Sequence, residues 1–132
     1  MSPRIRRQVR TRATSRCEYC RLPDWLEFAG PFHVEHVIAR QHAGGSEMAN
    51  LAWACSRCNA HKGTNLTAID PDGTGIVALF NPRKNSWQDH FRLDAAHIHG
   101  VTASGRATVW LLQMNSEHRL ELRSELIAAG LW

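Results

Sequence analysis

The sequence of 132 residues lacks the features of several large classes of protein. It has no apolar run longer than Ile76–Phe80, far short of the ~20 residues that a membrane-spanning helix needs. Its arginine-rich beginning is not followed by the apolar segment of a secretory signal peptide. With 43% hydrophobic and 21% charged residues, its composition is neither that of a disordered chain nor that of a fibrous one. We therefore expect a folded, cytoplasmic protein without a membrane partner, forming one domain over residues 1–132.

Lysine is scarce: Lys62 and Lys84 are the only lysines among 16 cationic residues. Residues 1–21 hold seven arginines and one glutamate, a net charge of +6, whereas the rest of the chain holds nine cationic and eleven acidic residues, a net charge of −2. The guanidinium group is a planar fork that suits phosphate, so nucleic acid is the first partner to consider. A solvated basic helix is the alternative. The arginines concerned are Arg4, Arg6, Arg7, Arg10, Arg12, Arg16 and Arg21.

Cysteine occurs only four times, as two pairs of the same spacing. Two residues separate Cys17 from Cys20, and two separate Cys55 from Cys58. This spacing lets both thiolates of a pair bind one ion, and two pairs complete the tetrahedral site that zinc prefers. Two disulfides are disfavoured in a reducing cytoplasm, and a redox pair is seldom duplicated. The sequence therefore predicts structural Zn²⁺, with the 34 residues between Cys20 and Cys55 forming a loop or hairpin that begins and ends at the metal.

Apolar periodicity and turn residues predict an α+β fold. In the first half we expect a helix over 3–15, strands over 32–38 and 51–54, and a helix over 56–62 that Gly63 ends. In the second half we expect a strand over 76–80, a hairpin of 91–93 with 98–101, a helix from Ser104 to 114, and a last helix from 115 or 116 to Gly130. The second half is rich in leucine and tryptophan and is expected to supply apolar core.

Two short segments carry the residue types of phosphodiester hydrolysis. Glu35 and His36 lie between the cysteine pairs, and Asn59 and Lys62 follow the second pair. Metal-assisted hydrolysis needs an oxygen ligand for a divalent cation, a base that is neutral near pH 7, and positive charge on the phosphate. Glu35, His36 and Lys62 supply these in turn, and Asn59 adds a neutral oxygen ligand.

In order and spacing, these residues resemble the HNH endonucleases of the ββα-metal fold. The resemblance covers roughly residues 15–64, and its motifs are Cys17-x-x-Cys20, Glu35-His36, Gly44-Gly45, Asn50-Leu51 and Cys55-x-x-Cys58-Asn59-x-x-Lys62. It implies a basic N-terminal helix over 1–16, a zinc-bracketed core over 17–64, and an extension over 65–132 that packs on the core and ends in two helices.

The resemblance implies a metal-dependent DNA endonuclease with 5′-phosphate and 3′-hydroxyl products. His36 would be the general base, while Glu35 and Asn59 would hold the catalytic divalent cation, for which we expect Mg²⁺, with Mn²⁺ or Ni²⁺ as alternatives. Asn50 would brace the loop between the two strands, and Lys62 would contact or polarise phosphate. The four cysteines correspond to the structural zinc site of the family, and the N-terminal arginines would contact the DNA backbone.

Some residues depart from the family pattern. Asn59 at the third signature position makes this an H-N-N variant, and Ala39 stands where a proline is common. His33 and His61 each lie two residues from a proposed ligand and are possible further ligands. Strand alternation sends Glu35 and His36 to opposite faces, so both reach one phosphate only if the strand ends or twists there. The alternative functions are a non-catalytic, zinc-stabilised nucleic-acid-binding module and an enzyme directed at RNA.

Overall fold

A computed structural model describes residues 1–26, 30–73 and 75–132. The chain divides into two compact units, each of which combines short helices with a two-stranded sheet or sheets. Unit 1 comprises residues 1–65 and 81–84, and unit 2 comprises residues 66–80 and 85–132. No helix in the described part of the chain is sufficiently long and apolar to cross a membrane.

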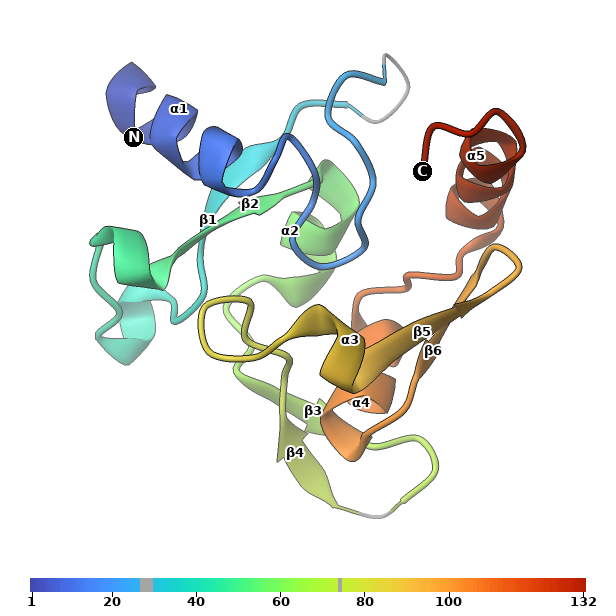
Figure 1. Ribbon diagram of the computed structural model, residues 1–132. Helices are drawn as coiled ribbons and strands as arrows, with labels where there is room; N and C mark the ends of the chain where they lie inside the picture. The colour runs from blue at the N-terminus through green and yellow to red at the C-terminus, as the bar shows by residue number, and fades with distance from the viewer. Residues whose placement is uncertain (27–29, 74) are drawn as a thin grey trace. The chain divides into compact units, whose positions relative to one another are not determined.

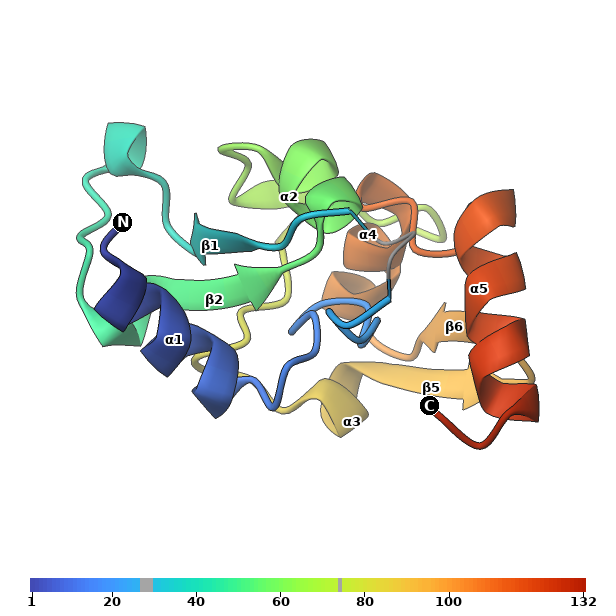
Figure 2. The same cartoon turned by 90° about the horizontal axis from the view of Figure 1, so that it is seen from above.

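Unit 1 is a β-hairpin between two helices. Its elements are α1 (Pro3–Arg12), β1 (His33–His36), the 3-10 turns Arg40–His42 and Met48–Asn50, β2 (Leu51–Ala54) and α2 (Ser56–Lys62). β1 and β2 pair antiparallel, with Glu35 opposite Ala52 and His36 opposite Leu51. α1 runs along one side of this hairpin and α2 lies on the other side (Figure 2).

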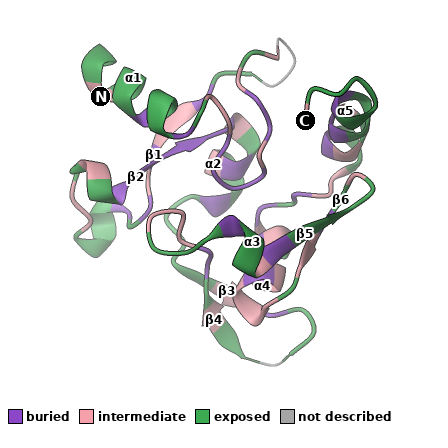
Figure 3. Cartoon of the chain, in the orientation of Figure 1, coloured by how far each residue is buried: buried purple, intermediate pink, exposed green. Residues whose placement is uncertain are grey.

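Local sequence sets the limits of these elements. Ser2 caps α1 by accepting a hydrogen bond from the Ile5 N–H at 3.2 Å, and Pro3 occupies the first turn, where its missing N–H costs nothing. The helix stops at Arg12, earlier than the predicted residue 15, because Thr14 and Ser15 adopt left-handed backbone with φ of 55° and 59°. β2 is buried along its whole length, whereas α1 is mostly exposed and buries Val9 (Figure 3).

Unit 2 consists of two hairpins and three helices (Figure 1). Its elements are β3 (Thr67–Ile69), β4 (Ile76–Ala78), α3 (Trp87–His90), β5 (Phe91–Asp94), β6 (His97–Gly100), α4 (Ala103–Leu111) and α5 (Glu117–Ala128). An aromatic cluster lies in its core, where the Phe91 ring is 5.1 Å from that of Phe80 and 5.0 Å from that of Trp87. α4 packs closely on the preceding elements because Gly105 has no side chain: a Cβ there would lie 2.2 Å from the His90 carbonyl oxygen.

Several features of unit 2 differ from the sequence-based expectation. β3 and α3 were not expected, and the cap of α4 is Thr102 rather than Ser104. The Thr102 hydroxyl accepts a hydrogen bond from the Gly105 N–H at 2.9 Å, whereas Ser104 lies inside the helix and donates to the Ala78 carbonyl. The predicted strand 76–80 and the last helix are also shorter than expected, ending at Ala78 and Ala128.

Candidate metal centre and active site

The four cysteines meet in the interior of unit 1. Their sulfur atoms all lie within 4.8 Å of one another, and each of the residues is buried. Cys17 and Cys20 lie on the turns that follow α1, while Cys55 is the N-cap of α2 and Cys58 lies in its first turn. The Cys55 Sγ accepts a hydrogen bond from the Cys58 N–H at 3.4 Å, so the helix start itself fixes the second pair.

The spacing of the sulfur atoms fits a metal and not a disulfide. All four thiols are free, and Cys20 Sγ lies 3.7 Å from Cys55 Sγ. Sulfur atoms bound tetrahedrally to one zinc ion are about 3.8 Å apart, whereas bonded sulfurs are about 2.05 Å apart. Burial, and after it the neighbouring thiols, raises the pKa of Cys17 and Cys58 well above the ordinary value. The four cysteines are thus placed to bind a metal ion, consistent with structural zinc.

The first cysteine pair is tied to β2 by Glu18. The Glu18 N–H donates to the Trp53 carbonyl at 2.8 Å, and the Trp53 N–H donates to Glu18 Oε2 at 2.8 Å. Arg83 forms an ion pair with the other Glu18 oxygen. The metal-binding turn therefore continues the sheet on the edge of β2 that is away from β1, and it positions the hairpin relative to α2.

Asn50 holds the connection between β1 and β2. It is 7% exposed; its Oδ1 accepts from the Ile38 N–H at 2.9 Å, and its Nδ2 donates to the Ile38 and Gly45 carbonyls at 2.9 and 2.7 Å. Gly44 is needed in this loop because a Cβ there would lie 1.7 Å from the Ile38 oxygen. Ala39 has φ −62° and ψ 153°, the backbone conformation that proline imposes, so the turn is kept without the proline.

Glu35 lies between the hairpin and α2. It is 4% exposed; its Oε1 is 2.5 Å from Lys62 Nζ, and its Oε2 accepts a hydrogen bond from the Tyr19 hydroxyl at 2.6 Å. Lys62 is 2% exposed and also donates to the Val37 carbonyl at 2.9 Å. Burial raises the pKa of Glu35, and Lys62 and Tyr19 partly offset this effect. The structure thus joins Glu35, Lys62 and Tyr19 in one buried cluster.

The remaining proposed metal ligands lie on β1 and α2, the two elements that carry Glu35 and Lys62, and they differ in burial. Asn59 is half-buried on α2 and, three residues before Lys62, shares its helix face. His33 is half-buried and shares with Glu35 one face of β1. His61 is an exposed residue of α2. Sequence reasoning did not include Tyr19, whose phenol contacts the proposed carboxylate ligand; the chain's only tyrosine, next to a cysteine of the first pair, was the available signal.

His36 is the last residue of β1 and lies on the opposite face. Its Nε2 is 3.0 Å from Ser46 Oγ, to which the Arg40 guanidinium also donates at 3.3 Å. Burial, and after it the charge of Arg40, lowers the pKa of His36, so its imidazole is neutral at pH 7. Cross-strand pairing places His36 on the face of Val34 and Trp53, along which α1 packs. The histidine and the arginine-rich helix therefore share one side of the hairpin.

Comparison with known proteins identifies the segment around the cysteines. Residues 17–65 match the family model described as HNH endonuclease. These residues form an HNH endonuclease domain. The predicted resemblance and the predicted α+β, ββα-metal fold are both confirmed.

One curated relative extends the comparison beyond the HNH domain. The chain is 25% identical over 122 residues to the Septu protein PtuB of Bacillus thuringiensis, and the alignment covers 89% of this chain and 44% of that protein. The chain thus spans less than half the length of this relative. No solved structure gives a significant match. An HNH domain implies a nuclease-type function, and HNH nucleases act on DNA.

Proposed function

We propose that this protein is a metal-dependent DNA endonuclease that hydrolyses phosphodiester bonds with the residues of its HNH domain. The observation that carries the proposal is the placement of the signature residues within the matched segment. Glu35 lies between β1 and α2, the helix that carries Asn59, and His36 is the last residue of β1 on the opposite face, so one phosphate reaches both side chains around the end of the strand. His36 is half-exposed, as a base that meets a substrate must be.

Glu35 and Asn59 are the proposed ligands of the catalytic cation. Glu35 Oε1 is buried and paired with the Lys62 ammonium at 2.5 Å, so a cation bound there would replace or share this partner. A carboxylate and an amide oxygen suit Mg²⁺, with Mn²⁺ or Ni²⁺ as alternatives. His33 and His61 are candidates for additional ligands. The cation would stabilise negative charge on the scissile phosphate and on the leaving oxygen.

We assign two roles to Lys62. In the arrangement described here its ammonium neutralises Glu35, which would otherwise be an uncompensated buried charge. When a cation takes over this neutralisation, the ammonium is available to polarise the phosphate.

His36 is the proposed general base. A neutral imidazole next to a hydroxyl is suited to accept the proton of the attacking water, and the Ser46 Oγ at 3.0 Å marks a position from which an oxygen reaches Nε2. The expected products carry 5′-phosphate and 3′-hydroxyl ends.

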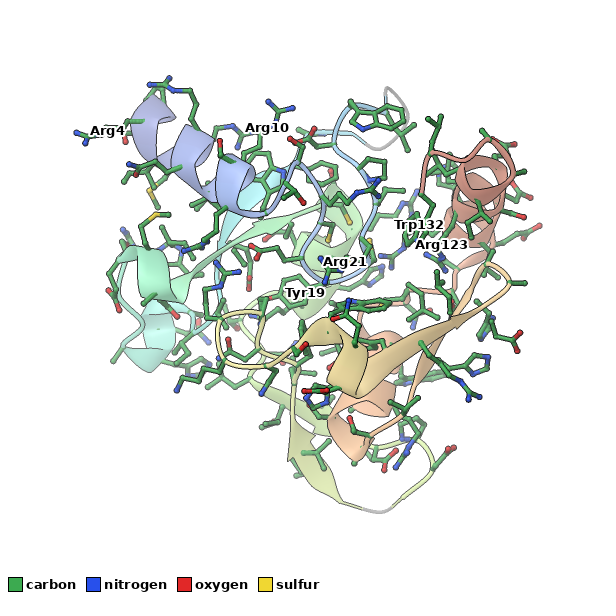
Figure 4. The ribbon with its side chains drawn as sticks, viewed as in Figure 1. Arg4, Arg10, Tyr19, Arg21, Arg123 and Trp132 are labelled. Carbon is green, nitrogen blue, oxygen red and sulfur yellow. The ribbon has the colours of Figure 1, made fainter. Side chains whose placement is uncertain are left out.

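The N-terminal arginines divide into two groups in this proposal. Four are engaged within unit 1: Arg6 lies over the Trp53 ring, Arg10 pairs with Asp24 at 2.6 Å, Arg12 donates to the Met48 and Leu51 carbonyls, and Arg16 donates to the Arg21 carbonyl at 3.1 Å. Arg21 is itself half-buried. Arg4 and Arg7 are exposed and make no such contact within the described part of the chain. Arg4 extends outward from the start of α1 (Figure 4). We therefore assign DNA backbone contact first to Arg4 and Arg7, on the side of the hairpin that carries His36.

The test is cleavage of supercoiled plasmid DNA with Mg²⁺, Mn²⁺ or Ni²⁺ present in turn. The protein as isolated should nick or linearise the plasmid, and His36→Ala should abolish cleavage while leaving DNA binding unchanged. The matched control is His118→Ala, which removes an exposed histidine from α5 and should cleave normally. Equal cleavage by His36→Ala and the unaltered protein would refute the assignment of the base. A parallel assay with an RNA substrate separates a DNA-directed from an RNA-directed enzyme.

A second candidate is a non-catalytic, zinc-stabilised nucleic-acid-binding module. The burial of Glu35 in an ion pair with Lys62 favours it, because a binding module has no need of a free carboxylate. Measuring binding and cleavage of the zinc-loaded protein, with Mg²⁺ first omitted and then restored and no chelator present, discriminates the two. A binding module behaves identically with and without Mg²⁺, whereas the proposed nuclease binds without Mg²⁺ but cuts only when it is restored.

A further inference from the structure

Unit 2 contains a pocket that lies outside the residues of the HNH domain. Its volume is about 450 Å³, within the range of small-molecule sites and sufficient for one nucleoside. One wall is a face of α4, where Arg106 and Trp110 are four residues apart, and Gln113 follows just after the helix. A second wall is β6 with His97 and His99.

Flat side chains line this pocket. Trp110 is 65% exposed although its indole is a large apolar group. His97 and His99, two residues apart on β6, have ring centroids 4.7 Å apart. Asp70 holds the planar guanidinium of Arg106 through two hydrogen bonds of 2.9 and 2.8 Å. Indole, imidazole and guanidinium planes are the surfaces on which nucleobases stack.

The charges of the pocket indicate a ligand without excess negative charge. Arg106, the cation in its lining, is paired with Asp70 and lies 3.6 Å from the Asp72 carboxylate. Two carboxylates next to one guanidinium leave no positive surplus to attract a phosphate group. The pocket therefore suits a neutral, planar ligand with polar edges.

One residue of the lining has a polar side-chain atom without a hydrogen-bond partner among the described residues. Ser116 Oγ is buried and has no hydrogen-bond partner among the residues described. Ser116 is the N-cap of α5, yet its side chain makes no capping bond. A buried hydroxyl without a partner is unusual in native proteins. Because Ser116 belongs to the lining, rotation of its side chain toward the pocket would give a ligand edge this hydroxyl to bond. Asn115, in contrast, is bonded to the backbone of Ile98. Its Oδ1 accepts from the Ile98 N–H at 2.9 Å, and its Nδ2 donates to the Ile98 carbonyl at 2.8 Å.

We propose that this pocket binds one unpaired nucleobase, stacked on Trp110 and hydrogen-bonded by Ser116. The inference extends the proposed function, since an unpaired base is presented by single-stranded nucleic acid. A base inside a duplex is stacked between its neighbours and does not enter such a pocket without being flipped out.

The test is a binding titration, in buffer without chelator and without added divalent cation, with a short single-stranded oligodeoxynucleotide that carries the fluorescent base 2-aminopurine. The zinc-loaded, full-length protein should change the 2-aminopurine fluorescence on binding. Trp110→Ala should weaken binding about fivefold or more, as loss of a base–aromatic stack does, whereas Trp110→Phe should retain most of it. Ser116→Ala should weaken binding about twofold to tenfold without lowering the melting temperature, because its hydroxyl makes no bond within the described chain.

The matched control is Trp25→Ala, which removes a tryptophan that is 52% exposed in unit 1 and should bind as the unaltered protein does. A duplex of the same sequence should show no difference between Trp110→Ala and the unaltered protein. The proposal is overturned if Trp110→Ala binds the single strand normally, or if it loses duplex and single-strand binding alike. Free 2-aminopurine nucleoside forms a separate arm: a Trp110-dependent signal there supports a pocket for the base alone, and a signal confined to the oligonucleotide supports a base held within a strand.

These measurements are made without a divalent cation and can be repeated in the His36→Ala background. Loss of plasmid cleavage with intact base binding would refute only the proposed catalysis. Intact cleavage with no effect of Trp110→Ala would refute only the pocket.

Discussion

Units 1 and 2 both bury cationic side chains, but the partners of these cations differ. In unit 1 the buried Lys62 forms an ion pair with the buried Glu35, and four cysteines are placed to bind a metal ion. In unit 2 the buried cations are Arg119 and Arg123, each 1% exposed, and their partners include backbone carbonyls. Unit 1 is therefore expected to depend on bound metal for its stability. Unit 2 is stabilised by hydrogen bonds to its own backbone and by an aromatic core, so the two units should respond differently to metal removal.

Removal of the metal should have the largest effect, and it should be confined to unit 1. Structural zinc contributes about 10–16 kcal/mol to the folding of small zinc domains. We therefore expect a chelator, or the Cys55→Ser/Cys58→Ser double substitution, to unfold unit 1 and leave unit 2 folded. Hydrogen exchange followed by mass spectrometry measures this directly: amides of residues 17–65 should lose protection, and those of β5, β6 and α4 should keep it. Equal loss of protection in both units would contradict the comparison.

Breaking the buried ion pair of unit 1 should have the next largest effect. Lys62→Met leaves Glu35 buried without its cation and should destabilise the zinc-loaded protein by about 3–5 kcal/mol. The double substitution Glu35→Gln/Lys62→Met removes both charges and should recover most of that loss. Urea unfolding of the single and double variants gives the coupling energy. Additive effects would show that the two side chains do not depend on each other.

Removing a buried arginine should weaken unit 2 by a similar or smaller amount. Arg123 donates to the Ala96 and Met114 carbonyls at 2.5 and 3.0 Å and to Asn115 Oδ1 at 2.9 Å, and its guanidinium lies over the Trp132 ring (Figure 4). Arg123→Met leaves these acceptors unsatisfied, which we expect to cost about 2–4 kcal/mol. Arg92→Met, at an exposed position of β5, is the control and should be near neutral. Urea unfolding should show the loss in unit 2 alone; a loss of zinc from unit 1 would argue against independent stabilisation.

Substitution of the exposed arginines of α1 should change DNA binding and hardly affect stability. Arg4→Ala/Arg7→Ala should lower the slope of log affinity against log salt by about 2, because two phosphate contacts are lost. Arg12→Ala should instead destabilise unit 1, since it removes the hydrogen bonds to the Met48 and Leu51 carbonyls. Fluorescence anisotropy with labelled duplex DNA over a range of salt concentrations measures the slope. An unchanged slope in the double variant would remove Arg4 and Arg7 from the DNA interface.

The parts of the fold that were predictable from sequence are those with local causes. β2 and α2 have the predicted bounds, since Leu51–Ala54 is an apolar run, Cys55 caps the helix and Gly63, with φ 51°, ends it. The cysteine spacing likewise predicts the metal site. β3 was missed because its partner strand lies across a turn and two of its three residues are exposed, so no apolar alternation marks it.

The interior contacts of charged residues were also not predictable, because they join segments that are far apart in the sequence. Nothing local in the last helix marks Arg119 and Arg123 as buried, because their acceptors belong to residues 96 and 112–115. The pairing of Glu35 with Lys62 depends on how α2 packs against β1 and not on either segment alone. These contacts depend on how the helices pack. The periodicity of a single sequence indicates where helices and strands lie, but not how they pack together.

We propose that unit 1 binds two metal ions of different chemistry: zinc on four thiolates, and a divalent cation on Glu35 and Asn59. Electron paramagnetic resonance of Mn²⁺ added to the zinc-loaded protein tests it directly. We predict one bound Mn²⁺ that Asn59→Ala and Glu35→Gln/Lys62→Met both abolish, with zinc content and folding unchanged. Mn²⁺ binding of normal strength in both variants would contradict the claim.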